Sequence, residues 1–432
     1  MTTTITKTVE ATTTVEHLLP AVENLAKICT KQRKNMRIRT NPNSTLTLSV
    51  DNWEVTAEVT LPATNTTPGE FTVDAPRTNT MLKKAVGKRN KTTNALPVTF
   101  VATDSNVAMT ISDITLNLDQ ETPLEDHGFN LPESSPIGAF PAATIREVWP
   151  QVASSCSTDD SLPMLTGVDM KLVGNKCEFR STDRFRLSTT TVDYTPHVDP
   201  QMLENKSILI RGNSLKLLVG QLKTVEGEVT VKFVGNTKPC EGILSFEFEN
   251  TVFTAKLLDA DFPNIDPLLA KQAETVCVFN RNELVTKLKK LSGVAPRFAD
   301  LRINIVDGEV GLNIFDKTGR MDDNGNSIPL ATTTIDTDVA YKTGRNTLFG
   351  VNCNYLVDCL NSFDVEDIAL TLMNPGRPVL MFDANEYDAD GNITVDKKKM
   401  IKDATEQLGR LDVCDLPARD HKMILMPIRL PG

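Results

Sequence analysis

The sequence predicts an α+β fold in which one two-helix unit occurs three times in tandem. Apolar residues spaced i, i+4 and i+7, the pattern of one helix face, occur at residues 15–29, 141–157 and 282–291. A second helix is predicted after each of these, at residues 79–88, 213–223 and 354–363. At roughly 150 residues per domain, a chain of 432 residues has room for about three such units.

Start signals support the first set of helices. Thr13 with Glu16, and Asn280 with Glu283, have the spacing of a capping box. Pro141 suits a first helical turn, where the missing N–H of proline is not needed. The three helices are therefore predicted to begin close to these residues.

Segments of alternating polar and apolar residues surround the helices. They include residues 44–61, 227–235, 242–258 and 301–315, and several are interrupted by "DN", "EN" or "DG". A period of two with such interruptions predicts hairpins of antiparallel strands. The predicted domains are residues 1–135, 136–266 and 267–432, the last with an insertion at about 386–417.

The charge, hydropathy and cysteine pattern argue against several classes of protein. A net charge of −10 argues against a general nucleic-acid binder. No segment has the apolar length of a membrane span, and the N-terminal residues lack a signal-peptide pattern. The eight cysteines are scattered without a CxxC pair, so reduced, mostly buried thiols are expected rather than disulfides. We expect a soluble protein with no membrane partner.

Sequence signatures of enzymes and cofactor sites are missing. The chain has no GxxxxGK[ST], GxGxxG, HExxH or GxSxG motif. The segment "EYDADGN" resembles a calcium loop, but Lys397 stands where that loop needs a glutamate. We therefore predict no enzymatic activity, no cofactor and no metal site. A hydrolase or nuclease whose site assembles in space is the least favoured alternative, because the histidines lie far apart: His17, His127, His197 and His421.

Basic residues gather on the repeated helices of an otherwise acidic chain. Most charge runs form a solvated helix face, and that is the simplest interpretation. Recurrence on equivalent helices favours a second one, a positive lining that faces DNA phosphates without reading base sequence. The predicted DNA-facing residues are Lys31, Arg33, Lys83, Lys84, Lys88, Arg211, Lys216, Lys289 and Lys290.

Four short segments resemble signature patterns of the bacterial β sliding clamp, the processivity subunit (DNA polymerase III β subunit) of the replicative polymerase. The family patterns are "TDxxRL", "FPxY", "fNxxYLxxxL" and a terminal "MPxRL". This chain has "TDRFRL" at 182–187, "FPNI" at 262–265, "VNCNYLVDCL" at 351–360 and "MPIRL" at 426–430. The segments follow the family's order, and residues 136–432 match better than residues 1–135.

The resemblance implies a DNA sliding clamp and no catalytic reaction. Clamps of this family are head-to-tail homodimeric rings of six similar domains, with helices around the hole and strands outside. Such a ring encircles double-stranded DNA and tethers the replicative DNA polymerase. The implied partners also include the clamp loader and other proteins with clamp-binding peptides. The implied location is the cytoplasm of a bacterium or of a phage-infected host.

The resemblance also implies a cleft between the second and third domains that binds a short partner peptide. An apolar hollow with a few polar anchors suits such a ligand. For Leu165, Leu187 and Ile424 the alternative is simple core packing. The terminal segment is expected to be an edge strand of the third domain whose tail forms one wall of the cleft. The implied cleft residues are Leu165, Thr182, Arg184, Phe185, Arg186, Leu187, Pro263, Pro267, Leu268, Asn352, Tyr355, Pro378, Ile424, Met426, Pro427, Ile428, Arg429 and Leu430.

The chain departs from the family pattern at positions that affect peptide preference. Arg184 and Phe185 stand where the family usually has Gly-His, and Pro163 and Met164 stand where aromatic residues are common. These changes indicate a divergent member and raise the hypothesis of a phage or mobile-element gene. A second functional hypothesis is a clamp-like decoy or regulator that binds partner peptides without encircling DNA.

Overall fold

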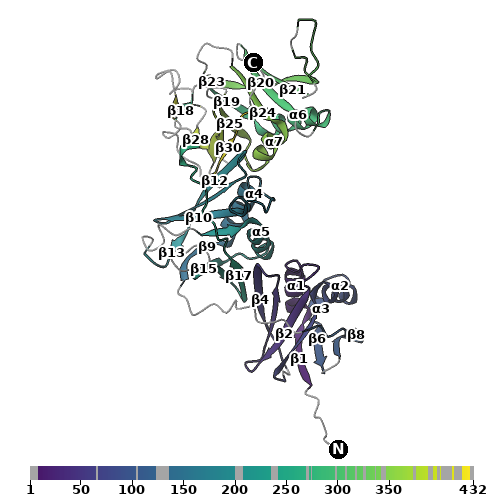
Figure 1. The fold of residues 1–432 in the computed structure, drawn as a ribbon. Helices are drawn as coiled ribbons and strands as arrows, with labels where there is room; N and C mark the ends of the chain where they lie inside the picture. The colour runs from purple at the N-terminus through teal and green to yellow at the C-terminus, as the bar shows by residue number, and fades with distance from the viewer. Residues whose placement is uncertain are drawn as a thin grey trace, which may run out of the picture. The chain divides into compact units, whose positions relative to one another are not determined.

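Antiparallel pairing organises the sheets of the protein (Figure 1). Every strand pair whose register is described runs antiparallel, so the predicted α+β class is confirmed. The computed structural model describes residues 8–64, 67–103, 106–122, 136–199, 208–234, 242–268, 272–273, 275–296, 299–306, 309–316, 319–324, 327–335, 337–341, 347–372, 376–387, 393–396, 399, 411–412 and 421–428.

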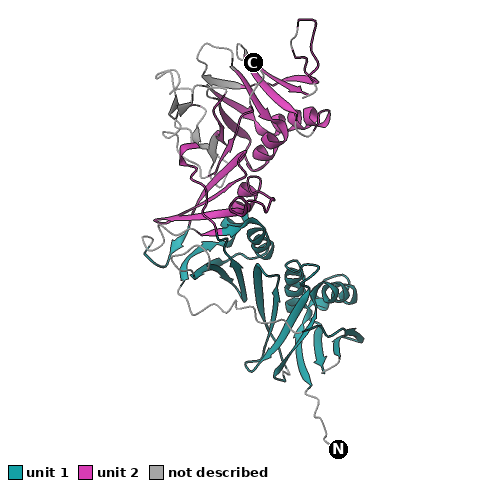
Figure 2. Cartoon of the chain, viewed as in Figure 1, with its two compact units in different colours: residues 1–146, 194–203, 210–259 teal, residues 147–193, 204–209, 260–432 magenta. Residues whose placement is uncertain are grey.

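The chain divides into two units, which are coloured separately in Figure 2. The first comprises residues 1–146, 194–203 and 210–259, and the second comprises residues 147–193, 204–209 and 260–432. The threefold division at residues 135 and 266 stays a prediction. No described helix is long and apolar enough to span a membrane.

The first unit holds a nine-stranded and a four-stranded sheet. The order in the larger is β13 (Thr195–Pro196), β9 (Pro136–Pro141), β15 (Glu228–Val234), β16 (Ile243–Phe248), β17 (Thr251–Lys256), β4 (Val55–Pro62), β3 (Thr45–Asp51), β2 (Asn35–Asn41) and β5 (Gly69–Asp74). The smaller is β1 (Val9–Thr14), β6 (Pro97–Ala102), β7 (Val107–Ile111) and β8 (Ile114–Leu118). Strands β17 and β4 pair with Phe253 opposite Ala57, which joins the first two predicted domains in one sheet.

The second unit repeats this plan. Its larger sheet has the order β10 (Gly167–Val173), β11 (Lys176–Thr182), β12 (Arg186–Asp193), β30 (His421–Leu425), β26 (Val379–Asp383), β25 (Asp367–Leu372), β19 (Thr275–Asn280) and β23 (Asp338–Tyr341). Strand β14 (Leu209–Arg211), of which residues 210 and 211 are assigned to the first unit, pairs with β10. The smaller is β22 (Ala331–Ile335), β21 (Glu309–Phe315), β20 (Asp300–Val306) and β24 (Thr347–Asn352). Two short pairs are β18 (Gln272–Ala273) with β29 (Leu411–Asp412) and β27 (Asn385–Tyr387) with β28 (Ile393–Asp396).

Strand β30 is the last strand that predicted domain 3 contributes to this sheet, as expected for an edge strand of that domain. It also pairs with β12 of predicted domain 2, with Leu187 opposite Ile424 and Ile424 opposite Leu380, so both of its sides are hydrogen-bonded. Its apolar side chains pack on both faces of the sheet, where Met423 and Leu425 join one core cluster and Ile424 another. The run of apolar residues near the C-terminus is therefore explained by burial in the sheet.

All six predicted helices are present, and the described residues add a short one. They are α1 (Val15–Ala26), α2 (Ala75–Val86), α4 (Ala142–Ala153), α5 (Gly212–Gln221), α6 (Arg281–Gly293) and α7 (Cys353–Asn361), with α3 (Lys91–Asn94) between α2 and β6. The predicted insertion 386–417 contains β28 and β29, and most of it lies outside the described residues.

Helix starts were predicted with mixed success. Asn280 caps α6, because its Oδ1 accepts a hydrogen bond from the Glu283 N–H at 3.0 Å. The Thr13 capping box is wrong, since Thr14 is the N-cap of α1 and makes no side-chain cap bond. Helix α2 begins four residues earlier than predicted, at Ala75, because the Asp74 carboxylate accepts from the Arg77 N–H at 2.8 Å.

Short 3-10 turns and free thiols are further features of the described residues. The turns are η1 (Pro163–Thr166) and η4 (Asp266–Leu268). Six cysteines in the described residues are free thiols, and burial raises the pKa of Cys277 to about 12 and of Cys353 to about 11. Cys240 and Cys414 lie outside the described residues.

Candidate peptide-binding site

A tight turn from Thr182 to Arg186 joins β11 to β12. The Asp183 Oδ1 accepts hydrogen bonds from the N–H groups of Phe185 (2.9 Å) and Arg186 (2.6 Å). The Thr182 hydroxyl donates to the Arg186 carbonyl at 2.8 Å and accepts from the Arg184 N–H at 3.3 Å. These bonds hold Arg184 at φ 78°, in the left-handed region that glycine adopts without strain. The turn therefore keeps the backbone that suits the family's glycine while presenting an arginine.

Arg186 is the electrostatic centre of this region. Its Nε and Nη2 donate to Asp183 Oδ2 at 2.9 and 2.7 Å, and its Nη1 donates to Asp358 Oδ2 at 2.8 Å. Only 12% of the Arg186 side chain is exposed. Burial by itself lowers the pKa of Arg186, but the Asp183 carboxylate outweighs it, so the pKa is raised and the group stays charged.

An aromatic wall stands beside this ion-pair network. The rings of Phe185 and Tyr355 lie 5.7 Å apart, and the Arg186 guanidinium carbon lies 4.5 Å from the Tyr355 ring centre. Tyr355 is in the first turn of α7, which Asn352 caps by accepting the Tyr355 N–H at 3.1 Å. Phe185 is 49% exposed, so one side of the wall is open to a ligand.

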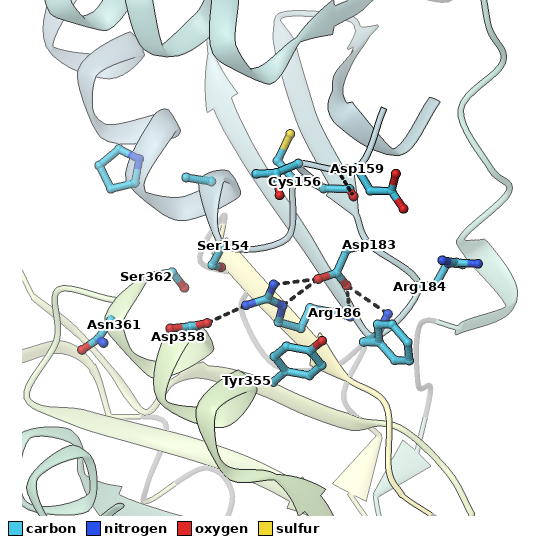
Figure 3. Close-up of a pocket in the computed structure, with 15 residues that line it drawn as sticks. Ser154, Cys156, Asp159, Asp183, Arg184, Arg186, Tyr355, Asp358, Asn361 and Ser362 are labelled. Atoms are coloured by element: carbon cyan, nitrogen blue, oxygen red, sulfur yellow. Dashed lines mark hydrogen bonds and ion pairs between the residues drawn. The ribbon is translucent and has the colours of Figure 1, made fainter. Parts of the chain in front are cut away.

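The turn borders a hollow of about 710 Å³ in the second unit (Figure 3). Its other walls come from the end of α4, the segment 154–159 that follows it, Asp358 and Asn361 of α7, and Ser362 just after that helix. Figure 3 shows Arg186 between Asp183 and Asp358, with Arg184 set apart from that network. Hydrogen bonds from Ser161 lower the pKa of Asp159 in the segment 154–159, and Arg184 adds to this effect. The hollow is consequently polar on one side and aromatic on the other.

Four predicted cleft residues line this hollow and four others are buried. The lining residues are Arg184, Phe185, Arg186 and Tyr355. The buried ones are Leu165, Thr182, Leu187 and Ile424, whose exposed fractions are between 1% and 7%. Leu187 and Ile424 belong to a core cluster, so the alternative of core packing describes them in this structure.

The remaining predicted cleft residues are more accessible. Pro267 and Leu268 are exposed on η4, while Pro263, Asn352, Pro378, Met426, Pro427 and Ile428 are half-buried. Two backbone hydrogen bonds hold the terminal segment. The Met426 N–H donates to the carbonyl of Phe185 in the turn 182–186 at 2.8 Å, and the Ile428 N–H donates to the carbonyl of Gly350 on β24 at 2.9 Å. Arg429 and Leu430 lie outside the described residues.

His421, the first residue of β30, links that strand to β12 and to Ser362, which lines the hollow. The sequence did not predict these contacts. The His421 Nδ1 lies 2.9 Å from the Thr190 hydroxyl of β12, and its Nε2 lies 2.9 Å from the Ser362 hydroxyl beyond α7. Burial lowers the pKa of His421 to about 4, so the ring is neutral near pH 7. Because its partners lie 231 and 59 residues away in sequence, no local pattern identifies this cluster.

The predicted DNA-facing residues divide by their partners. Lys83 Nζ lies 3.0 Å from Glu23 Oε1, and a hydrogen bond from Lys83 lowers the pKa of Glu23. Arg211 Nε lies 3.0 Å from Glu54 Oε1. These two charges are already offset within the first unit. The others on helices and in loops are exposed, namely Lys31, Lys84, Lys88, Lys216, Lys289 and Lys290, while Arg33 is half-buried against a tryptophan ring.

Comparison with known proteins decides the family. A family model described as DNA polymerase III beta subunit, central domain, matches residues 139–264, and one for the C-terminal domain of the same subunit matches residues 267–395. The chain belongs to the DNA polymerase III beta-subunit family. The predictions of a divergent sliding clamp and of a protein without enzymatic activity are thereby confirmed.

Relatives of this beta subunit are distant in sequence. It is 24% identical over 306 residues to the beta sliding clamp of Streptomyces coelicolor, covering 70% of this chain and 68% of that one. It is 29% identical over 184 residues to the beta sliding clamp of Micrococcus luteus, covering 42% and 57%. The chain thus spans between about half and two thirds of these relatives.

Solved structures show the same fold over nearly the whole beta subunit. The sliding clamp of Pseudomonas aeruginosa bound to griselimycin aligns with a TM-score of 0.75 and 16% identity, over 98% of this chain and 100% of that one. The beta subunit of Thermotoga maritima gives the same TM-score, identity and coverage. The clamp fold therefore includes the described part of residues 8–122, where the sequence resemblance is weak.

Proposed function

We propose that two copies of this beta subunit close head to tail into a ring that encircles duplex DNA and tethers a replicative polymerase. The family supports DNA and polymerase as partners at this coarse level. The finer proposal includes a clamp loader, and a peptide-binding cleft formed by the turn 182–186, α7 and the terminal segment. The observation that carries the cleft is the exposed Phe185–Tyr355 wall beside a hollow of about 710 Å³.

Exposed basic side chains support the DNA-binding part of the proposal. Lys84 and Lys88 follow each other along α2 and beyond it, and Lys289 and Lys290 lie together on α6. None of the four has an ion pair within the described residues. Such cations attract phosphates in a sequence-independent, salt-sensitive way. Because the rest of the chain is acidic, DNA should be attracted only to the surface that carries these lysines.

Exposed apolar side chains support head-to-tail closure. Ile114 is 42% exposed on β8, which is the last strand of its sheet in the described residues. Val294, at the C-terminal end of α6 in the other unit, is 64% exposed. A closed ring needs a heterologous contact between two different surfaces of the chain. We propose that the β8 edge of one copy and the end of α6 of the next belong to that contact.

Partner peptides would enter through the aromatic wall. A peptide with two apolar anchors would place one ring or aliphatic chain against Phe185 and Tyr355, which offer area at low entropic cost. Arg184 has no hydrogen bond or ion pair from its side chain within the described residues, so its charge is available to a polar or acidic neighbour of the anchors. Bulk and charge at 184 and 185 should narrow the range of accepted peptides.

Light scattering and peptide titration test this proposal together. The full-length chain is expected to have twice its monomer mass of 47.5 kDa at micromolar concentration, and to bind a fluorescent peptide taken from the clamp-binding segment of a replicative polymerase. A chain that stays monomeric contradicts the ring. Peptide binding by such a monomer would instead support the decoy hypothesis.

A further inference from the structure

Trp53 is exposed at the tip of the hairpin between β3 and β4. Its surface is 52% accessible, and its φ of 78° lies in the left-handed region. Large side chains rarely adopt this conformation, because it costs free energy that glycine would not incur. The chain therefore keeps about half of a large indole exposed in a strained turn, and both features are unfavourable for stability alone.

The hairpin fixes the position of this indole. The Asp51 carboxylate accepts a hydrogen bond from the Trp53 N–H at 2.5 Å, and the Asn52 Oδ1 accepts from the Val55 N–H at 2.8 Å. The Asn52 amide also donates at 3.1 Å to the carbonyl of Ile28, a buried residue in the loop that follows α1. The turn is thus anchored to a second loop, and the ring is held in place before any ligand arrives.

Arg33 in that second loop lies on the indole. Its guanidinium carbon is 3.6 Å from the ring centre. Within the described residues Arg33 has no ion pair, and its Nε and Nη2 are covered without a hydrogen-bond partner. Its neighbour Lys31 is exposed. A stacked arginine without a carboxylate leaves a positive charge beside an aromatic surface.

We propose that Trp53 and Arg33 form a stacking platform for single-stranded DNA, with an unpaired base against the indole and a phosphate beside Arg33 and Lys31. An indole can stack only on a base that is not already stacked within a duplex, which favours single-stranded over double-stranded DNA here. Aromatic residues in cationic surroundings bind single strands in this way without sequence preference. The inference rests on the proposed clamp function, which brings DNA to the chain.

Intrinsic fluorescence tests the platform directly. The chain has two tryptophans, so Trp149→Phe leaves Trp53 as the only indole. In this full-length variant, a thymidine oligonucleotide of about a dozen residues should quench the emission, and added salt should reverse the quenching. A duplex of equal length should quench less. Unchanged emission with the oligonucleotide at low salt, or stronger quenching by the duplex, overturns the proposal.

Trp53→Gly separates binding from folding. Glycine suits the backbone at φ 78°, so this variant should unfold at no lower urea concentration than the parent. Its affinity for the oligonucleotide, measured by anisotropy of a labelled strand, should fall about tenfold, and Trp53→Phe should restore part of it. Equal affinity in the glycine variant and the parent contradicts the platform.

Two further outcomes separate this inference from the proposed function. Quenching of Trp53 by a polymerase-derived peptide and not by the oligonucleotide would make the surface a protein contact, and would overturn the platform. Retention of the chain on circular DNA without any Trp53 response would refute the platform and leave the ring intact. Quenching by the oligonucleotide without retention on circles would support the platform and contradict the ring.

Discussion

Two regions of the chain each place an arginine beside an aromatic ring, but only one of the two arginines is paired with carboxylates. In the turn from Thr182 to Arg186, Arg186 is bound by two carboxylates and faces Tyr355. Beside the tip of the β3–β4 hairpin, Arg33 of the loop after α1 covers Trp53 and has no carboxylate partner within the described residues. The first arrangement fixes a binding wall, because the charge of Arg186 is matched by carboxylates. The second places a cation without a carboxylate partner beside an indole that is 52% exposed.

Replacing each arginine by alanine should show the largest contrast. Arg186→Ala leaves the largely buried Asp183 carboxylate without its cation partner, so the free energy of unfolding should fall by about 3 kcal/mol. Arg33→Ala removes only a partly exposed stack and should cost less than about 1 kcal/mol. Urea denaturation of both variants measures the difference.

Asp358→Asn is the matched control for this contrast. Its carboxylate is 52% exposed, so its loss should cost less than about 1 kcal/mol. Equal losses for Arg33→Ala and Arg186→Ala would show that the two regions do not differ in the way described.

Acidification should weaken the second unit through His421. Burial lowers the pKa of His421 from its ordinary value of 6.5 to about 4 in the folded chain. Below pH 6.5 the unfolded chain therefore binds a proton at this residue, and the folded chain does so only near pH 4. Stability is therefore complete above about pH 6.5 and falls as the pH drops toward 4. Between about pH 7.5 and 5 the loss should be about 2 kcal/mol.

His421→Gln isolates this effect. The variant should lose less stability over the same pH range, by about the amount that His421 contributes. Urea denaturation at both pH values gives the comparison, and an identical pH dependence in parent and variant would show that His421 is not the titrating group.

Phe185→Ala should weaken peptide binding with little change in stability. Half of the ring is exposed, and its removal opens the wall against Tyr355, so affinity for a polymerase-derived peptide should fall about tenfold. Val173→Ala is the control, because Val173 is 50% exposed on the same unit and does not line the hollow. Fluorescence anisotropy would contradict the cleft if both variants bind alike.

The smallest effect should distinguish two neighbouring lysines on α2. Lys84 is exposed and has no ion pair in the described residues, whereas Lys83 is paired with Glu23. Lys84→Gln should reduce the salt dependence of DNA binding by about one phosphate contact, and Lys83→Gln by less. Affinities at several salt concentrations test this order.

The sequence predicted all six long helices because a buried face recurs along each of them. It misplaced some of their ends, since caps such as Asp74 depend on local geometry that spacing alone does not determine. The family motifs predicted Arg186 and Tyr355 as cleft residues, and both line the hollow. They did not identify Asp358, which reaches Arg186 across 172 residues.

For Leu187 and Ile424 the sequence left two interpretations open, a place in the cleft or packing in the core, and the motifs could not choose between them. Leu187 and Ile424 are core residues because β30 inserts beside β12, a pairing between strands more than 200 residues apart. The same pairing makes the apolar terminal segment an interior strand. Trp53 gave no motif at all, and only its exposure and its backbone conformation distinguish it.

Retention on circular DNA tests the central claim most directly. The full-length chain would be loaded by a clamp loader onto a nicked circle, separated from free protein by gel filtration, and passed through the column again after one cut that linearises the circle. An encircling ring should stay with the intact circle in high salt and slide off once the DNA is linear. Equal retention on circular and linear DNA, or none on either, would contradict it.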